Sequence, residues 1–178
     1  GEISAAMLKS MDIKQVVLGH SERREYFNES NKFLSEKVSK VLSHGLTPIF
    51  CCGEPLSVRE DNQQNAFVTN QLEESIFHLN AEEVAKVVFA YEPIWAIGTG
   101  RTASAEQAQE MHEVIRHFFE KKYGAAVAEK LIILYGGSVN AANAAALFSM
   151  PDVDGGLVGG ASLQANDFLQ IISAAANS

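Results

Sequence analysis

The chain has 178 residues, of which 47% are hydrophobic and 20% charged, and its formal net charge at pH 7 is -8. These values are typical of a globular protein with one hydrophobic core. No cluster of Lys or Arg forms a basic stripe, so DNA, RNA and anionic lipid are not expected partners. The apolar runs are shorter than the ~20 residues that a membrane span needs, so a membrane protein is not expected either.

The two cysteines, Cys51 and Cys52, are adjacent in the sequence. Neighbouring residues have poor geometry for a disulfide bond. We therefore expect both thiols to be reduced and the protein to be cytoplasmic. The first residues also lack the charged and then apolar pattern of a secretory signal.

The first half of the chain predicts helices and strands in alternation. We expect helices at 1–10, at 30–44 and in a segment ending near residue 78, and strands at 15–18 and 47–51. The helix at 30–44 carries apolar residues at helical spacing and is followed by Gly45, a residue typical of helix C-termini. The strands are short apolar runs, as is usual for parallel strands buried on both faces.

The second half continues the same alternation. We expect strands at 87–90, 131–134 and 153–158, and helices at 105–123, 140–148 and 168–175. Five strands that alternate with helices predict an α/β fold with a parallel sheet. Because no linker or low-complexity segment interrupts the pattern, we expect a single domain over residues 1–178.

A segment at 90–102, with the sequence Ala-Tyr-Glu-Pro-Ile-Trp-Ala-Ile-Gly-Thr-Gly-Arg-Thr, contains the first candidate catalytic residue. Glu92 ends the third predicted strand, and Pro93 turns the chain out of regular structure. Ser104 and Gln107 then form a capping-box pattern that begins the next helix. In α/β enzymes the C-terminal ends of strands carry the chemistry. Considered alone, however, Glu92 is more often a structural carboxylate.

His20 is the second candidate, in the sequence Gly-His-Ser-Glu-Arg-Arg after the first strand. Its ring is placed to lie over the N-terminus of a short helix, where positive potential disfavours the imidazolium form. A purely local hydrogen bond is the alternative for such a histidine. A base and a hydrogen-bond donor are what the isomerisation of an α-hydroxy ketone requires. Glu92 and His20 suit these two roles.

Two glycine-rich segments follow the last two predicted strands. They are Gly136-Gly137-Ser138 and Gly159-Gly160. Backbone N–H groups near helix starts bind anions, and barrel enzymes commonly hold phosphate at the last two strand exits. Each glycine pair alone could be only a tight turn. Together they indicate a phosphate site.

The segments at 90–102 and 19–24 closely resemble the lid and the second signature of triose-phosphate isomerase. The resemblance implies that Glu92 is the base that moves a proton between two carbons, and that His20 is the electrophile that polarises the substrate carbonyl. This pairing is a known property of that family and not a deduction from the residues. It also implies a triose phosphate substrate, and a place in glycolysis and gluconeogenesis.

Further roles come from the same resemblance. It assigns Gly98, Ser138, Gly159 and Gly160 to phosphate binding and Glu22, Cys51 and Tyr135 to supporting positions, with Tyr135 holding the lid near Ala103. For Cys51, a small buried apolar role is equally consistent. Trp95 is expected to pack beneath the lid, and Arg101 stands where the family more often has lysine.

No metal or cofactor is expected. The remaining histidines, which are His44, His78, His112 and His117, have no metal-ligand spacing. We assign all four to solvated surfaces.

The expected fold is an incomplete TIM (β/α) barrel. A complete barrel has eight βα units in roughly 250 residues, whereas the resemblance covers five units and omits the family's first three. The family's first-strand lysine and asparagine therefore have no counterpart here. Loss of one such stabilising group typically lowers the rate by about 10²–10³, so we expect the isolated chain to be impaired.

An open barrel also has unpaired strand edges, which tend to associate. We therefore expect a homo-oligomer formed through the sheet edges, or a complex with a complementing N-terminal fragment. Two functional alternatives remain open. One is a non-catalytic, self-assembling barrel fragment that keeps only phosphate binding. The other is a different phosphate-handling barrel enzyme, although the two signature segments argue against it.

Overall fold

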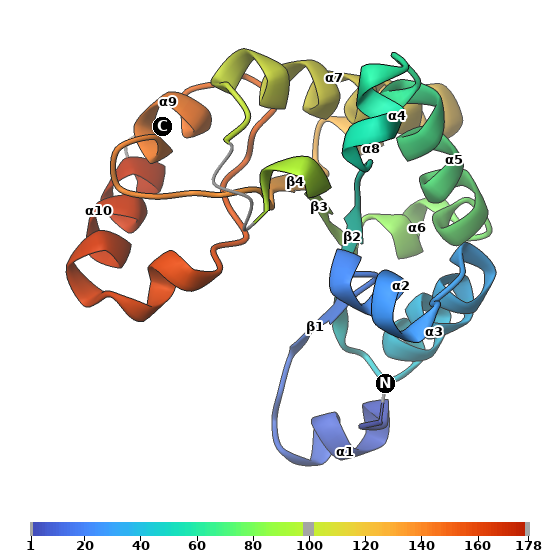
Figure 1. Cartoon of the computed structure of the whole chain (residues 1–178). Coiled ribbons are helices and arrows are strands. Elements are labelled where there is room, and N and C mark those ends of the chain that lie inside the picture. Colours follow the sequence, from blue (N-terminus) through green and yellow to red (C-terminus); the bar gives the residue numbers. More distant parts are fainter. Residues whose placement is uncertain (1, 98–101, 177–178) are drawn as a thin grey trace.

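The computed structural model describes residues 2–97 and 102–176. Its central feature is a parallel sheet whose strands follow one another in chain order (Figure 1). The strands are β1 (Gln15–Leu18), β2 (Thr47–Cys52), β3 (Val88–Tyr91) and β4 (Ile132–Tyr135). Their positions agree with the predicted ones to within a residue, and the α/β class with parallel strands is confirmed.

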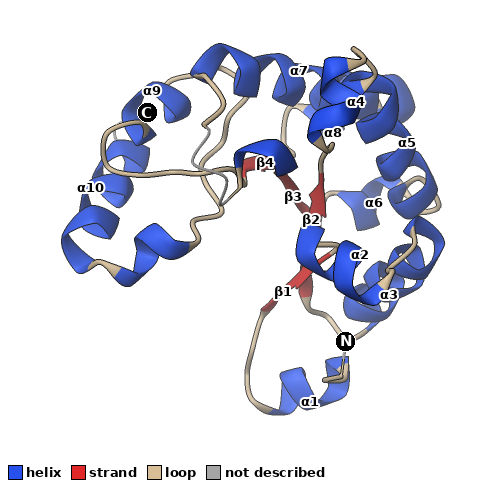
Figure 2. Cartoon of the chain, viewed as in Figure 1, coloured by secondary structure: helices blue, strands red, loops and turns tan. Residues whose placement is uncertain are grey.

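Helices precede, connect and follow the strands, and those between β1 and β4 lie along one side of the sheet (Figure 2). They are α1 (Ala5–Ser10), α2 (Ser21–Phe27), α3 (Asn31–Ser43), α4 (Leu56–Glu60), α5 (Gln64–Ile76), α6 (Ala81–Val84), α7 (Ala105–Tyr123), α8 (Ala125–Ala128), α9 (Ala144–Phe148) and α10 (Ala165–Ala176), with 3-10 turns η1 (Ile94–Ala96) and η2 (Gly160–Leu163). The long helices α3, α5 and α7 pack side by side along the outer side of the strands.

Local sequence signals explain where the main helices begin. The side chain of Ser4 accepts a hydrogen bond from the backbone of Met7 at the start of α1. Ser30 caps α3 in the same way. Ser104 and Gln107 make the reciprocal capping box at the start of α7. These contacts satisfy N–H groups that a helix cannot pair internally, so the cap residues determine where each helix starts.

The two faces of the sheet differ sharply in burial. Side chains on the helix-covered face are 8% exposed or less, in a row formed by Leu18, Phe50, Phe89 and Ile133. The neighbouring row on the opposite face is Val17, Ile49, Val88 and Ile132. Val17 and Ile132 in this row are 44% and 47% exposed. Successive residues of a strand point to opposite faces. The described helices therefore cover one face, whereas the opposite face is half-exposed at this row, although Cys51 and Ala90 two positions further along it are buried.

The predicted fifth strand at 153–158 is wrong as a regular strand. Only Gly156 forms a bridge, with Tyr135 of β4. The segment does run parallel to β4, because the N–H of Tyr135 donates to the carbonyl of Gly155 at 2.9 Å and the N–H of Leu157 donates to the carbonyl of Tyr135 at 2.9 Å. Gly155 has a φ of +143°, which interrupts the extended backbone.

The short helix expected after the first strand is present as α2. One other expectation needs correction. The short helix expected from Asn140 begins only at Ala144, since the Asn140 side chain instead accepts hydrogen bonds from Ala142 and Asn143 in a preceding turn. Among residues 2–97 and 102–176, no helix combines the length and apolar character needed to cross a bilayer.

Candidate active site

Glu92 and His20 meet at the C-terminal ends of the strands. His20 follows β1 and Glu92 follows β3, on either side of β2. The Nε2 atom of His20 lies 3.1 Å from Oε1 of Glu92. The other carboxylate oxygen, Oε2, accepts a hydrogen bond from the backbone N–H of Ser21 at 3.1 Å. The structure therefore brings the two candidate catalytic residues into direct contact.

His20 is the N-cap residue of α2, as the sequence suggested. Its Nδ1 atom accepts the backbone N–H of Glu22 at 3.3 Å. A neutral imidazole has one donor and one acceptor nitrogen. In this arrangement the ring proton consequently lies on Nε2, the atom that faces Glu92. The helix N-terminus thus orients the ring and selects its tautomer.

The carboxyl group of Glu92 is only 2% exposed. This burial raises its pKa from 4.5 to about 7, because a carboxylate loses hydration when it leaves water. The hydrogen bond from Ser21 and the charge of Arg24 oppose the shift, and the charge of Glu22 adds to it. A carboxyl group whose pKa lies near neutrality can both accept and return a proton at physiological pH.

Two glycines allow the chain to pack against Glu92. A Cβ atom at Gly53 would lie 1.7 Å from the carbonyl oxygen of Glu92, and one at Gly136 would lie 2.9 Å from its Cγ. The Glu92 N–H donates to the carbonyl of Cys52 at 2.7 Å. Gly53 is not among the sequence-predicted site residues, although a glycine directly after the second strand was a usable signal.

Arg24 connects the segments that carry this site through hydrogen bonds of its guanidinium group. Its guanidinium donates to the carbonyl of Gly19 at 2.7 Å, to the carbonyl of Cys51 at 3.1 Å and to the side chain of Asn31 at 2.7 Å. Burial lowers the pKa of Arg24. Gly19 has a φ of +73°, a conformation that L side chains rarely adopt. The turn that delivers His20 is thus fixed by a glycine and an arginine.

A second buried carboxylate joins β2 to the segment that precedes residues 98–101. Glu54 is fully buried and accepts hydrogen bonds from the Tyr91 hydroxyl at 3.0 Å and from Trp95 Nε1 at 2.9 Å. Arg59 lies 3.4 Å from the same oxygen. Trp95 is half-buried here. The sequence analysis missed the parts played by Tyr91 and Arg59, which only the fold brings together.

The candidate phosphate-binding residues differ in their exposure and in their contacts. Ser138 is half-buried, and its hydroxyl donates to the carbonyl of Ala96 at 2.9 Å. Gly159 and Gly160 are exposed, and a Cβ atom at either position would contact nothing within 4 Å. Gly160 begins η2. Gly98 and Arg101 lie outside the described residues.

The supporting residues also differ. Tyr135 is buried, and burial raises the pKa of its hydroxyl group to about 12. The backbone of Ala103 makes a smaller, opposing contribution to this pKa. Cys51 is fully buried and its thiol pKa is raised by burial, as for a small core residue. Glu22 is exposed, and its backbone N–H donates to His20.

The assignment of all four remaining histidines to the surface is wrong for His112. Its side chain is completely buried on α7, and its pKa is lowered to about 4 because burial disfavours the imidazolium form. His78 and His117 are exposed, and His44 is half-buried. In the part of the chain that the structure describes, no group of three or more His, Cys, Asp or Glu side chains is arranged to hold a metal ion.

Comparison with known proteins points to one family over nearly the whole chain. The profile of the family described as "Triosephosphate isomerase" matches residues 1–175. The chain is 60% identical to the triosephosphate isomerase of Cytophaga hutchinsonii over 171 residues, which cover 96% of this chain and 68% of that protein.

Two further relatives carry the same name. The protein of Flavobacterium johnsoniae is 54% identical over 98% of this chain and 70% of its own length. The protein of Bacteroides fragilis is 56% identical over 98% of this chain and 69% of its own length.

Proposed function

Because this chain belongs to the triosephosphate isomerase family, a family of isomerases whose pathway is glycolysis, we propose that its site interconverts dihydroxyacetone phosphate and glyceraldehyde 3-phosphate through an enediolate. The observation that supports this most directly is the contact of 3.1 Å between His20 and Glu92. It joins a carboxyl group with a pKa of about 7 to an imidazole whose Nε2 is the donor.

In the proposed reaction Glu92 is the base. Its carboxylate removes a proton from the carbon that bears the hydroxyl group. The electron pair of that C–H bond forms the C=C bond of the enediolate, and the π electron pair of the carbonyl moves onto its oxygen. The former carbonyl oxygen then takes up a proton and the former hydroxyl group gives one up, so that a C=O bond forms at the first carbon while Glu92 returns its proton to the neighbouring carbon. Both carboxylate oxygens are engaged, one by Ser21 and one by His20. Substrate therefore has to displace at least one of these contacts.

His20 is the proposed electrophile. Its Nε2–H would donate to the carbonyl oxygen of the substrate, where negative charge develops as the enediolate forms. A donor held in place before the reaction stabilises such charge without reorganisation. The contact between the Glu22 N–H and Nδ1 supplies that preorganisation, because it keeps the proton on the opposite ring nitrogen.

We further propose that Gly98, Ser138, Gly159 and Gly160 bind the phosphate group of the substrate, with Glu22, Cys51 and Tyr135 in supporting positions. The exposed backbone at Gly159 and Gly160 is compatible with an anion ligand. A cytoplasmic location and the absence of any required metal or cofactor stay predictions from the sequence.

The described sheet is proposed to be part of a TIM barrel within a single domain, with residues 1–178 supplying five of its βα units. The family's first-strand lysine and asparagine have no counterpart among these residues. The 178-residue chain assayed by itself should then isomerise substrate slowly or not at all.

The test is an assay of the purified chain with glyceraldehyde 3-phosphate. Glu92→Gln keeps the size of the side chain and removes its basicity, so it is the matched control. We expect the unmodified 178-residue chain to turn over substrate about as slowly as Glu92→Gln does. Addition of a peptide that carries the family's first three units should restore a rate that depends on Glu92. Near-normal turnover of the chain alone, lost in Glu92→Gln, would refute the proposed impairment.

A second candidate is a non-catalytic, self-assembling piece that keeps only phosphate binding. The half-exposed aliphatic row that includes Val17 and Ile132 favours association, because parallel sheets are normally covered on both faces. A cavity of about 380 Å³ also lies beside the edge strand β1, lined by Val16, Val17 and Leu18. We propose either a homo-oligomer or a complex with a complementing fragment. Light scattering that gave a stable monomer would contradict both.

A further inference from the structure

The segment at 152–158 is held against β4 by an irregular ladder. The N–H of Asp154 donates to the carbonyl of Ile133 at 3.1 Å, whereas Tyr135 is bridged to Gly156. The first contact pairs Ile133 with the residue before Asp154, so two residues of β4 are spanned by three residues of the segment. An extra residue of this kind is a bulge, and Gly155 occupies it.

One ladder bond that a regular parallel strand would make is absent next to the bulge. In that bond the Ile133 N–H would donate to the backbone carbonyl of Asp152. The Ile133 N–H instead donates to the side chain of Asp154 at 2.7 Å. The Asp152 carbonyl instead accepts from Arg116 at 3.1 Å and lies 3.1 Å from His112 Nδ1. Side chains from α7 and from the segment itself therefore replace the backbone pairing.

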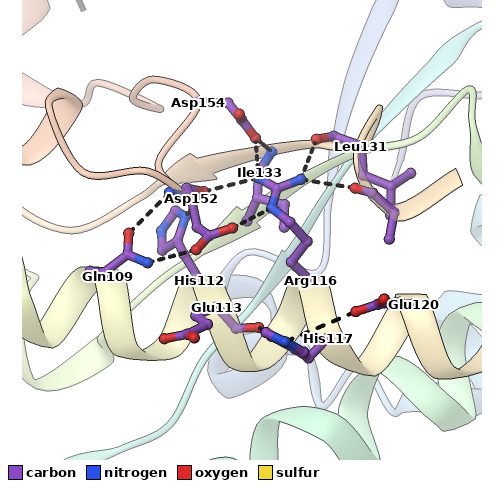
Figure 3. Close-up of polar contacts among 11 residues, drawn as sticks. Gln109, His112, Glu113, Arg116, His117, Glu120, Leu131, Ile133, Asp152 and Asp154 are labelled. Carbon is purple, nitrogen blue, oxygen red and sulfur yellow. Dashed lines mark hydrogen bonds and ion pairs between the residues drawn. The ribbon is translucent and has the colours of Figure 1, made fainter. Parts of the chain in front are cut away.

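Arg116 lies at the centre of these side-chain contacts (Figure 3). Besides the Asp152 carbonyl, its guanidinium donates to the carboxylates of Asp152 at 2.6 Å and Asp154 at 2.9 Å. It also donates to the carbonyls of Ala128 at 2.9 Å and Leu131 at 3.1 Å, just before β4. The side chain is 16% exposed. One planar, charged group thus joins α7, the start of β4 and the bulged segment, a set of contacts that the point charge of lysine cannot reproduce.

Gln109, two turns before Arg116 on α7, contacts the same segment. Its amide nitrogen donates to the Asp152 carboxylate at 2.6 Å, and its amide oxygen accepts the Asp152 N–H at 3.0 Å. The carboxylate of Asp152 is therefore held by two side chains of one helix. Its orientation is set before any ligand binds.

We propose that Arg116 is a positioning residue for the phosphate group of the substrate, acting through the bulged segment. Gly159 follows Leu157, the last residue bonded to β4 in this segment, by two positions. The segment makes three backbone hydrogen bonds to β4, and Arg116 adds contacts at Asp152 and Asp154 that fix the chain where it enters the bulge, upstream of Gly159 and Gly160. The proposal rests on the phosphate role of these glycines that is proposed above.

The test uses the 178-residue chain with Arg116→Gln, Arg116→Lys and, as a matched control, Ile115→Val. The control removes one buried methylene from the adjacent position of α7 without touching the contacts of Arg116. Affinity for inorganic phosphate is measured by calorimetry under conditions where circular dichroism shows each variant folded. Amide hydrogen exchange is measured without ligand.

We expect Arg116→Gln to weaken phosphate binding at least tenfold and to speed exchange at Leu157 at least tenfold, with no change at Phe89 of β3. Ile115→Val should stay within twofold of the parent in both measurements. If Arg116→Gln does not fold, Arg116→Lys is the deciding variant, with at least a fivefold loss expected in both. Parent-like phosphate affinity in the deciding variant would overturn the proposal, and so would unchanged exchange at Leu157.

The two measurements also separate this proposal from the one on which it rests. If the parent chain binds no phosphate, the phosphate role of Gly159 and Gly160 fails, and with it the effect of Arg116 on ligand binding. The exchange rate at Leu157 still decides whether Arg116 holds the bulged segment.

Discussion

The buried carboxyl group of Glu92 predicts a specific pH dependence of stability. Burial raises its pKa from 4.5 to about 7. Between these two values the folded chain binds more protons at this site than the unfolded chain, so the free energy of unfolding falls as pH rises. Each unit of pKa difference corresponds to about 1.36 kcal/mol. Keeping Glu92 ionised in the folded state above pH 7 therefore costs about 3 kcal/mol.

Glu92→Gln removes this titration and keeps the shape of the side chain. The amide of Gln cannot accept hydrogen bonds from both the Ser21 N–H and the His20 Nε2–H in the way the two carboxylate oxygens do, because only one of its two terminal atoms is an acceptor. This mismatch lowers stability by about 1–3 kcal/mol at every pH. The informative quantity is consequently the difference in unfolding free energy between variant and parent as a function of pH.

The assay is urea unfolding followed by circular dichroism at intervals from pH 4 to pH 8. We expect the difference, variant minus parent, to increase by up to about 3 kcal/mol across this range. Glu36→Gln, which removes a carboxylate from an exposed position of α3, is the matched control. A flat difference for Glu92→Gln would refute the argument that burial controls this carboxyl group.

Two further predictions concern packing and acid stability. Gly53→Ala would place a methyl group 1.7 Å from the Glu92 carbonyl oxygen, so we expect the free energy of unfolding in urea to fall by more than about 4 kcal/mol. The control is Gly45→Ala, where the positive φ is strained but the surroundings are open, and it should lose about 1 kcal/mol. A smaller loss for Gly53→Ala than for Gly45→Ala would contradict the close approach. Burial lowers the pKa of His112 from 6.5 to about 4, so between these values the folded chain binds fewer protons at this site than the unfolded chain. The free energy of unfolding therefore falls by up to about 3 kcal/mol as pH falls through this interval. His112→Asn should be less acid-sensitive than the parent over that range, and an unchanged acid transition would argue against this cause.

Residues near one another in the chain account for most of what sequence patterns predicted correctly. Ser30 and Ser104 satisfy N–H groups three residues away, so their positions alone predict where α3 and α7 begin. The strands at 15–18 and 87–90 were recognisable because short apolar runs favour buried parallel strands. His20 and Glu92 were identified as candidates through the resemblance of their segments to a known family.

Long-range packing accounts for the errors. His112 has neighbours on α7 that are typical of a solvated helix, yet the segment at 152–158 covers it and its Nδ1 lies 3.1 Å from the Asp152 carbonyl. The same segment was predicted as a strand from Val153, Leu157 and Val158, but a bulge at Gly155 and the contacts of Arg116 take the place of regular pairing. Neither outcome is visible in local composition, because each depends on groups about 40 positions apart in the chain.

The sequence by itself thus determined the alternation of helices and strands, the helix caps and the identity of the candidate acid and imidazole. Only the tertiary structure decided that Glu92 touches His20, that its pKa lies near 7, and that one face of the sheet is covered while the other is half-exposed. The reason is physical. Capping and apolar periodicity act over a few residues, whereas desolvation depends on all the atoms that the fold assembles around a group.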